Sequence, residues 1–158
     1  MKKIFLASLI LLILVWCQLA FAADSCVQTL TGIRDSQTQI VLKYELAFVC
    51  TASSGAFTAT PISAANLVKL GGFFLYRAET KPSATAAPQD QYDITIVNAN
   101  GVDVVGGLLA NRSSTAVQDV LLAPSTGFYQ IGSSTLTVTP TGNNVASAAF
   151  TLVLEFTR

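Results

Sequence analysis

The strictest pattern in this chain is an alternation of apolar and polar side chains over residues 39–51. Every even position from Ile40 to Cys50 is aliphatic, aromatic or cysteine, whereas the odd positions include Lys43 and Glu45. Successive side chains of a β-strand point to opposite faces. This period therefore predicts a strand with one buried and one solvated face.

Other segments extend this prediction to most of the chain. Val145–Arg158 alternates in the same way and predicts a strand in the middle of a sheet. Gly72–Thr80 is apolar on both faces at its start, which predicts a strand covered from both sides. For residues 52–70 the sequence is consistent with one helical turn or with an irregular sheet edge, and it does not decide between them. Further strands are expected at Cys26–Arg34, Tyr92–Val97, Ser114–Leu122 and Ser134–Thr139, and residues Phe128–Ile131 are expected to form a short strand or a bend.

About eight strands separated by turn residues, without a long amphipathic helix, are typical of an all-β protein. The predicted fold is an antiparallel β-sandwich, either immunoglobulin-like or jelly-roll-like.

A hairpin turn is predicted at Asn100-Gly101. Both residues accept the positive φ that a two-residue type I′ loop requires. With that loop, Val97 would face Val104 and Ile96 would face Val105 on the returning strand.

The first 22 residues have the features of a signal peptide. Lys2 and Lys3 precede the apolar run Ile4–Val15, and Ala20-Phe21-Ala22 suits cleavage before Ala23. Residues 23–158 would then form a single β-sandwich domain with two more acidic than basic side chains. Such a domain lacks the basic surface that nucleic acid requires. The alternative is an uncleaved membrane anchor, because the apolar stretch has about the ~20 residues that span a bilayer.

Two cysteines remain after removal of the leader, Cys26 and Cys50. In an oxidising compartment such a pair usually forms a disulfide. A strand that folds back at residues 35–38 brings Cys26 level with residues near position 48, so we predict a Cys26–Cys50 bond. Two separately buried thiols are the alternative.

Candidates for chemistry are few. The chain contains no histidine, which excludes Ser-His-Asp and Cys-His catalysis. Asp90, Asp93, Asp103 and Asp119 could supply a carboxylate pair, but Asp93 and Asp103 are expected to face solvent on the hairpin. We therefore expect no catalytic residue, no cofactor and no metal site. Possible ligand contacts are the loop aromatics Phe57, Phe128 and Tyr129.

The segment from Tyr92 to Arg112 contains Tyr92-Asp93-Ile94-Thr95, Gly101, Asp103-Val104, Gly106-Gly107 and Asn111-Arg112. In order and spacing it resembles the YDIT…DGVDV…GG…NR core of a family of short phage and prophage proteins. The resemblance implies a virion-associated or accessory structural β-domain. A signal peptide and a disulfide are not expected in a virion component that assembles in the cytoplasm. Their predicted presence favours an exported descendant of this family or an assembly route that passes through the membrane.

These observations predict an exported, non-enzymatic structural or interaction protein that acts by self-association or by binding a virion or cell-surface partner. Its expected location is the periplasm, the cell surface or the medium, with membrane contact only through an uncleaved leader. A secreted carbohydrate-binding or ligand-binding β-sandwich is the alternative, and a small outer-membrane β-barrel is a second one.

Overall fold

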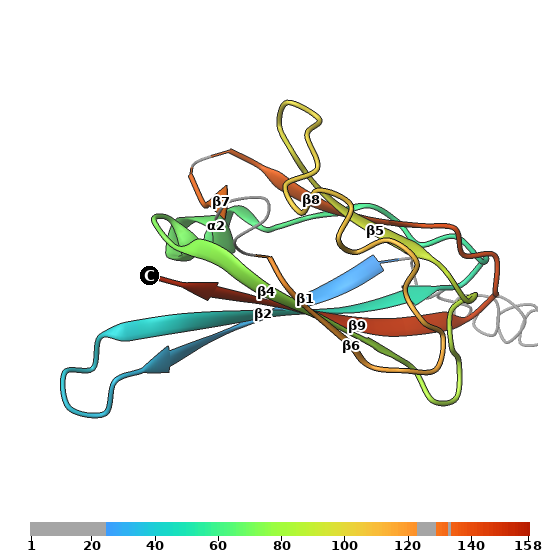
Figure 1. Cartoon of the computed structure of the whole chain (residues 1–158), viewed down its shortest axis with the longest axis horizontal. Helices are drawn as coiled ribbons and strands as arrows, with labels where there is room; N and C mark the ends of the chain where they lie inside the picture. The colour runs from blue at the N-terminus through green and yellow to red at the C-terminus, as the bar shows by residue number, and fades with distance from the viewer. Residues whose placement is uncertain (1–24, 123–128, 133) are drawn as a thin grey trace, which may run out of the picture.

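The computed structural model describes residues 25–122, 129–132 and 134–158. They form nine strands in two antiparallel sheets that lie one above the other (Figure 1). This arrangement confirms the prediction of an all-β, sandwich-like fold. The predicted leader, residues 1–22, lies outside the described residues.

The larger sheet has six strands. Its order is β1-β2-β9-β4-β6, and the short β7 pairs with the start of β4 on the side opposite β9, in line with β6. The smaller sheet has the order β3-β8-β5. The strands of the larger sheet are β1 (Ser25–Arg34), β2 (Val41–Ala52), β4 (Phe74–Pro82), β6 (Gln118–Leu121), β7 (Tyr129–Gln130) and β9 (Ala148–Thr157), and those of the smaller sheet are β3 (Thr60–Pro61), β5 (Asp93–Asn98) and β8 (Leu136–Thr141).

The core lies between the two sheets and follows the alternation in the sequence. Leu46 and Phe48 of β2 and Leu152 of β9 point inward from the larger sheet, where they are fully buried. Ile96 of β5 and Val138 of β8 face them from the smaller sheet. Burial of each such side chain contributes about 1.5–3 kcal/mol. As predicted, the closing strand β9 lies in the middle of its sheet, between β2 and β4.

The segment that the sequence left open contains β3 and a short helix, α2 (Ala64–Leu70). The helix begins at Ser63, whose hydroxyl accepts a hydrogen bond from the backbone N–H of Asn66 at 3.3 Å. A serine at this position satisfies one of the free N–H groups of the first turn. Leu67 and Leu70 are buried, so α2 adds its apolar side to the core.

Two strand predictions were wrong in part. β4 is covered on one face only: Ala78 is buried, whereas Tyr76 is 37% exposed. The outer face of the larger sheet has no covering layer among the described residues, so this strand has a solvated side (Figure 1). The strand expected from Ser114 begins only at Gln118. The hydroxyl of Ser113 accepts hydrogen bonds from the backbone N–H groups of Thr115 and Ala116, and these bonds form a turn before the strand.

The chain turns at Asn100-Gly101, but the predicted register was wrong. The carbonyl of Asn98 accepts from Gly101 N–H at 2.9 Å, and Asn98 N–H donates to the carbonyl of Val102 at 3.0 Å. The loop thus has three residues, and only Gly101 has a positive φ, of 77°. This geometry is a common three-residue hairpin loop. Val97 consequently pairs with Asp103 rather than Val104.

The returning arm of this hairpin is not a strand. Residues 104–109 form successive turns. β5 pairs along one edge with β8, from Asp93 opposite Thr141 to Asn98 opposite Leu136. The turns after the hairpin loop bond to its other edge, for example through Val104 N–H, which donates to the carbonyl of Ile96. The strand partner of β5 is therefore a distant segment, and the predicted second strand of the hairpin is absent.

Candidate interaction surface

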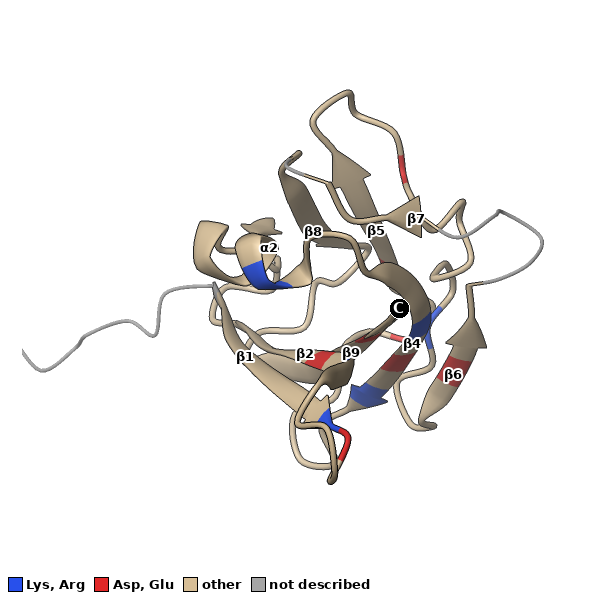
Figure 2. Cartoon of the chain, turned by 90° about the vertical axis from the view of Figure 1, so that its left-hand side faces the viewer, with Lys and Arg blue, Asp and Glu red and all other residues tan. Residues whose placement is uncertain are grey.

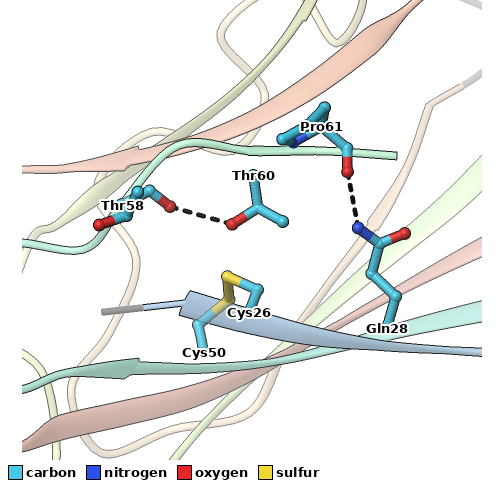
Figure 3. Close-up of a disulfide and its surroundings, with 6 residues drawn as sticks. All are labelled: Cys26, Gln28, Cys50, Thr58, Thr60 and Pro61. Atoms are coloured by element: carbon cyan, nitrogen blue, oxygen red, sulfur yellow. Dashed lines mark hydrogen bonds between the residues drawn. A yellow bond between two sulfur atoms is a disulfide. The ribbon is translucent and has the colours of Figure 1, made fainter. Parts of the chain in front are cut away.

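Cys26 and Cys50 form the predicted disulfide (Figure 3). The two residues lie directly opposite each other on β1 and β2, with their Cα atoms 4.0 Å apart. The bond closes the open end of the β1–β2 hairpin, because the connecting turn lies at the other end of both strands. A stable disulfide of this kind indicates an oxidising, exported environment.

The side chain of Gln28 joins β1 to the segment above it. Its Nε2 donates to the carbonyl of Pro61 at 2.6 Å (Figure 3), and its Oε1 accepts from the backbone N–H of Ser63 at 3.0 Å. The side-chain amide of Asn66 donates to the same oxygen at 3.2 Å. One residue thus holds β1 against β3 and the start of α2.

The carboxylates of the Tyr92–Arg112 segment bind backbone groups. One oxygen of Asp103 accepts from Ile96 N–H at 3.0 Å and Val105 N–H at 3.2 Å, and the other accepts from Gly107 N–H at 2.8 Å. Asp93 accepts from Asn111 N–H at 2.7 Å. These carboxylates were expected to face solvent, but both are only partly exposed because they replace the missing strand pairing. They hold the loop in place.

Arg112 and Tyr92 complete the support of this loop. Arg112 is 8% exposed, and its guanidinium donates to the carbonyls of Leu108 and Ala110. Burial lowers the pKa of Arg112, and burial raises the pKa of Tyr92 to about 12. The hydroxyl of Tyr92 has no hydrogen-bond partner among the described residues. The residues that carry the phage-family resemblance therefore have a structural role in this loop.

A network of ion pairs crosses the outer face of the larger sheet (Figure 2). Arg77 on β4 contacts Glu79, Asp119 on β6 and Glu155 on β9, and Lys43 on β2 contacts Glu155 and Glu45. The hydrogen bond to Asp119 raises the pKa of Arg77, and the hydrogen bond to Glu45 raises that of Lys43. Each cation of this network thus has carboxylate partners within the sheet.

The four aspartates considered for catalysis are accordingly engaged elsewhere. Asp90 accepts from the backbone N–H of Ser114 at 3.0 Å, and Asp119 binds Arg77. The described part of the chain contains no group of three or more histidine, cysteine, aspartate or glutamate side chains that could hold a metal ion. Within the same ranges, no helix is long and apolar enough to cross a bilayer.

Of the three aromatic residues proposed as ligand contacts, the structure describes Phe57 and Tyr129. Phe57 is buried and packs edge-on against Phe150 with ring centroids 4.9 Å apart, so its proposed role as an exposed contact was wrong. Tyr129 lies on β7 opposite Leu75, half-buried against the core. Phe128 lies outside the described residues.

Exposed apolar side chains gather instead on the β1–β2 hairpin, which extends beyond the other strands (Figure 1). Val27 is 65% exposed and lies opposite the exposed Val49 on the outer face. Ile40 and Leu42 were expected in the core, but both are exposed because the hairpin reaches past the smaller sheet. We call this set, completed by Ile33 near the turn, the hairpin surface.

The sequence matches no protein-family model and no curated protein.

Proposed function

We propose that this chain is an exported, non-enzymatic structural protein that works by associating with copies of itself, with the β1–β2 hairpin as its contact surface. The observation that supports this proposal is the hairpin surface. It contains five of the eleven large exposed apolar side chains among the described residues: Val27, Ile33, Ile40, Leu42 and Val49.

Single exposed apolar residues are normal, whereas neighbouring ones mark an interaction site. Val27 and Val49 are direct cross-strand neighbours beside the disulfide, and Ile33, Ile40 and Leu42 lie near the turn at the other end of the hairpin. The hairpin is also held in a defined shape, since its open end is closed by the disulfide and Gln28 ties it to β3. A rigid surface loses little conformational entropy on binding, which favours its use as an interface.

Export is supported by the disulfide together with the predicted signal peptide at residues 1–22. Within the exported compartments, the periplasm, the cell surface and the medium all suit an oxidised protein. The phage-family resemblance adds a virion-associated role as a specific form of this proposal, with a virion or cell-surface structure as the place of assembly.

The proposal is tested with the oxidised protein lacking residues 1–22. Light scattering and sedimentation from micromolar to millimolar concentration should detect reversible self-association. Val27→Lys should weaken it at least tenfold, because a charge on a strand edge opposes pairing. The matched control is Val102→Lys, since Val102 is 57% exposed but lies directly after the hairpin loop that follows β5. A wild-type protein that remains monomeric over this range would refute the proposal.

A further inference from the structure

We infer that two copies of this chain join through their β1 strands into one continuous antiparallel sheet, with Thr29 on the two-fold axis. This inference rests on the proposed self-association and adds the partner, the strand and the register. The occupant of the β1 edge is therefore a second copy of the same chain.

Three of the four sheet edges are protected in the described part of the chain. The β5 edge is covered by the turns that follow the hairpin loop. There, Ile94 N–H donates to the carbonyl of Leu109, and Arg112 N–H donates to the carbonyl of Tyr92. The β3 edge has only two residues, one of which is Pro61. The β6 edge is four residues long and contains Asp119. Short strands, proline and charge are the usual devices against edge pairing.

The β1 edge has none of these devices. β1 is ten residues long and pairs only with β2. Residues 25–33 contain no charged side chain and no proline. The one charged residue of β1 is Arg34 at its end, where a register irregularity also ends the regular pairing with β2. A long, uncharged edge of this kind is a template for another strand.

The disulfide shows which backbone groups of β1 point outward. In an antiparallel pair, residues with Cα atoms about 4.5 Å apart are not hydrogen-bonded to each other, whereas hydrogen-bonded pairs are about 5.5 Å apart. The 4.0 Å spacing places Cys26 in a position without such bonds to Cys50. Its N–H and C=O therefore point away from β2, and the same holds at alternate positions: Gln28, Leu30 and Gly32.

These four residues define a symmetric register, because their midpoint is Thr29. Antiparallel pairing about this point brings Cys26 opposite Gly32 of the second copy and Gln28 opposite Leu30. All four then exchange hydrogen bonds with their counterparts, about eight bonds in total. No other two-fold register uses all four. Thr29 faces Thr29 of the second copy in a position where side chains are close together.

The helix above β1 favours a second copy over an unrelated strand. α2 begins over Gln28 and lies on the same side of the molecule as β1 (Figure 2). Its exposed residues are Ala64 and Ala65, which are small, Val68, which is 83% exposed, and Lys69 in the last turn. The two-fold axis at Thr29 would bring the two α2 helices to the same side of the joined sheet. An added peptide strand would leave the exposed Ala64 and Val68 of this helix without a partner.

Cysteine cross-linking tests the register. In Thr29→Cys, the two introduced thiols meet on the axis, with Cα atoms about 4.5 Å apart, which suits a disulfide. Thr31→Cys is the matched control, because Thr31 is also exposed on β1. Its two copies would be ~13 Å apart along the strands, too far for a bond. Under mild oxidation we expect most of the Thr29→Cys protein, and little of the Thr31→Cys protein, to form a covalent dimer.

Peptide mapping must find the new link between the introduced thiols while Cys26–Cys50 remains intact. Equal cross-linking of both variants would overturn the register. Self-association of the wild type without cross-linking of either variant would overturn pairing through β1 but leave the proposed function standing. A wild-type protein that is monomeric at every concentration would overturn both.

Discussion

Removal of the disulfide by Cys26→Ala and Cys50→Ala together is expected to lower the free energy of unfolding by about 3 kcal/mol. The two residues are 24 positions apart in sequence. Closing a loop of that length restricts the unfolded chain by about 3 kcal/mol on the chain-entropy model. Alanine is the replacement because both thiols are buried, and a hydroxyl there would add a desolvation cost.

The measurement is thermal unfolding followed by circular dichroism at a single protein concentration. For a domain of this size, 1 kcal/mol shifts Tm by about 3–5 °C, so the expected decrease is about 10 °C. The control is reductant, which should lower the wild-type Tm to that of the double variant and leave the variant unchanged. A double variant that melts within about 2 °C of the oxidised wild type would show that the bond does not restrain the unfolded chain by the expected amount.

Two further predictions concern the loop between β5 and β6. Asp103→Ala should lower the free energy of unfolding by about 2 kcal/mol, because it removes an acceptor from three backbone N–H groups, including those of Ile96 and Gly107. Asp103→Asn, which keeps one acceptor oxygen, should cost less in urea titrations; equal losses would contradict this account. Tyr92→Phe should leave stability at pH 8 unchanged or raise it by up to about 1 kcal/mol, since the buried hydroxyl has no partner among the described residues. Because burial raises the folded-state pKa of Tyr92 to about 12, above its unfolded value near 10, the neutral ring stabilises the fold below pH 10 and this contribution is lost as the pH rises to 12. The decrease in wild-type stability between pH 9 and pH 11.5 should therefore be smaller in Tyr92→Phe, and identical decreases would contradict the assignment.

For the loop after β5, the local sequence predicts the position of the turn but not the length of the loop. Asn100-Gly101 correctly predicted a reversal of the chain, because glycine accepts the positive φ found at Gly101. The predicted loop length of two residues was wrong. The side chain of Asn98 accepts hydrogen bonds from the backbone N–H groups of Asn100 and Val102 and stabilises a three-residue loop. A loop that is one residue longer shifts the predicted pairing across the hairpin by one position.

The candidate interaction surface was also missed. The pattern from Ile40 to Cys50 has the same period throughout, and the sequence alone assigns all of its even positions to the core. Leu46 and Phe48 are buried, whereas Ile40 and Leu42 are exposed. The difference arises because the hairpin is longer than the sheet that covers it, and the extent of that cover depends on segments far away in the chain.

The sequence by itself determined the predominance of strands, the inward face of β9 and of the covered part of β2, and the pairing of Cys26 with Cys50. These features depend on side-chain period and on a hairpin closed by a short local turn, which are properties of neighbouring residues. Only the tertiary structure decided that β5 pairs with β8, and that β1 remains an open edge while the other edges are protected. Those outcomes depend on contacts between distant segments, whose order in a sheet no local pattern encodes.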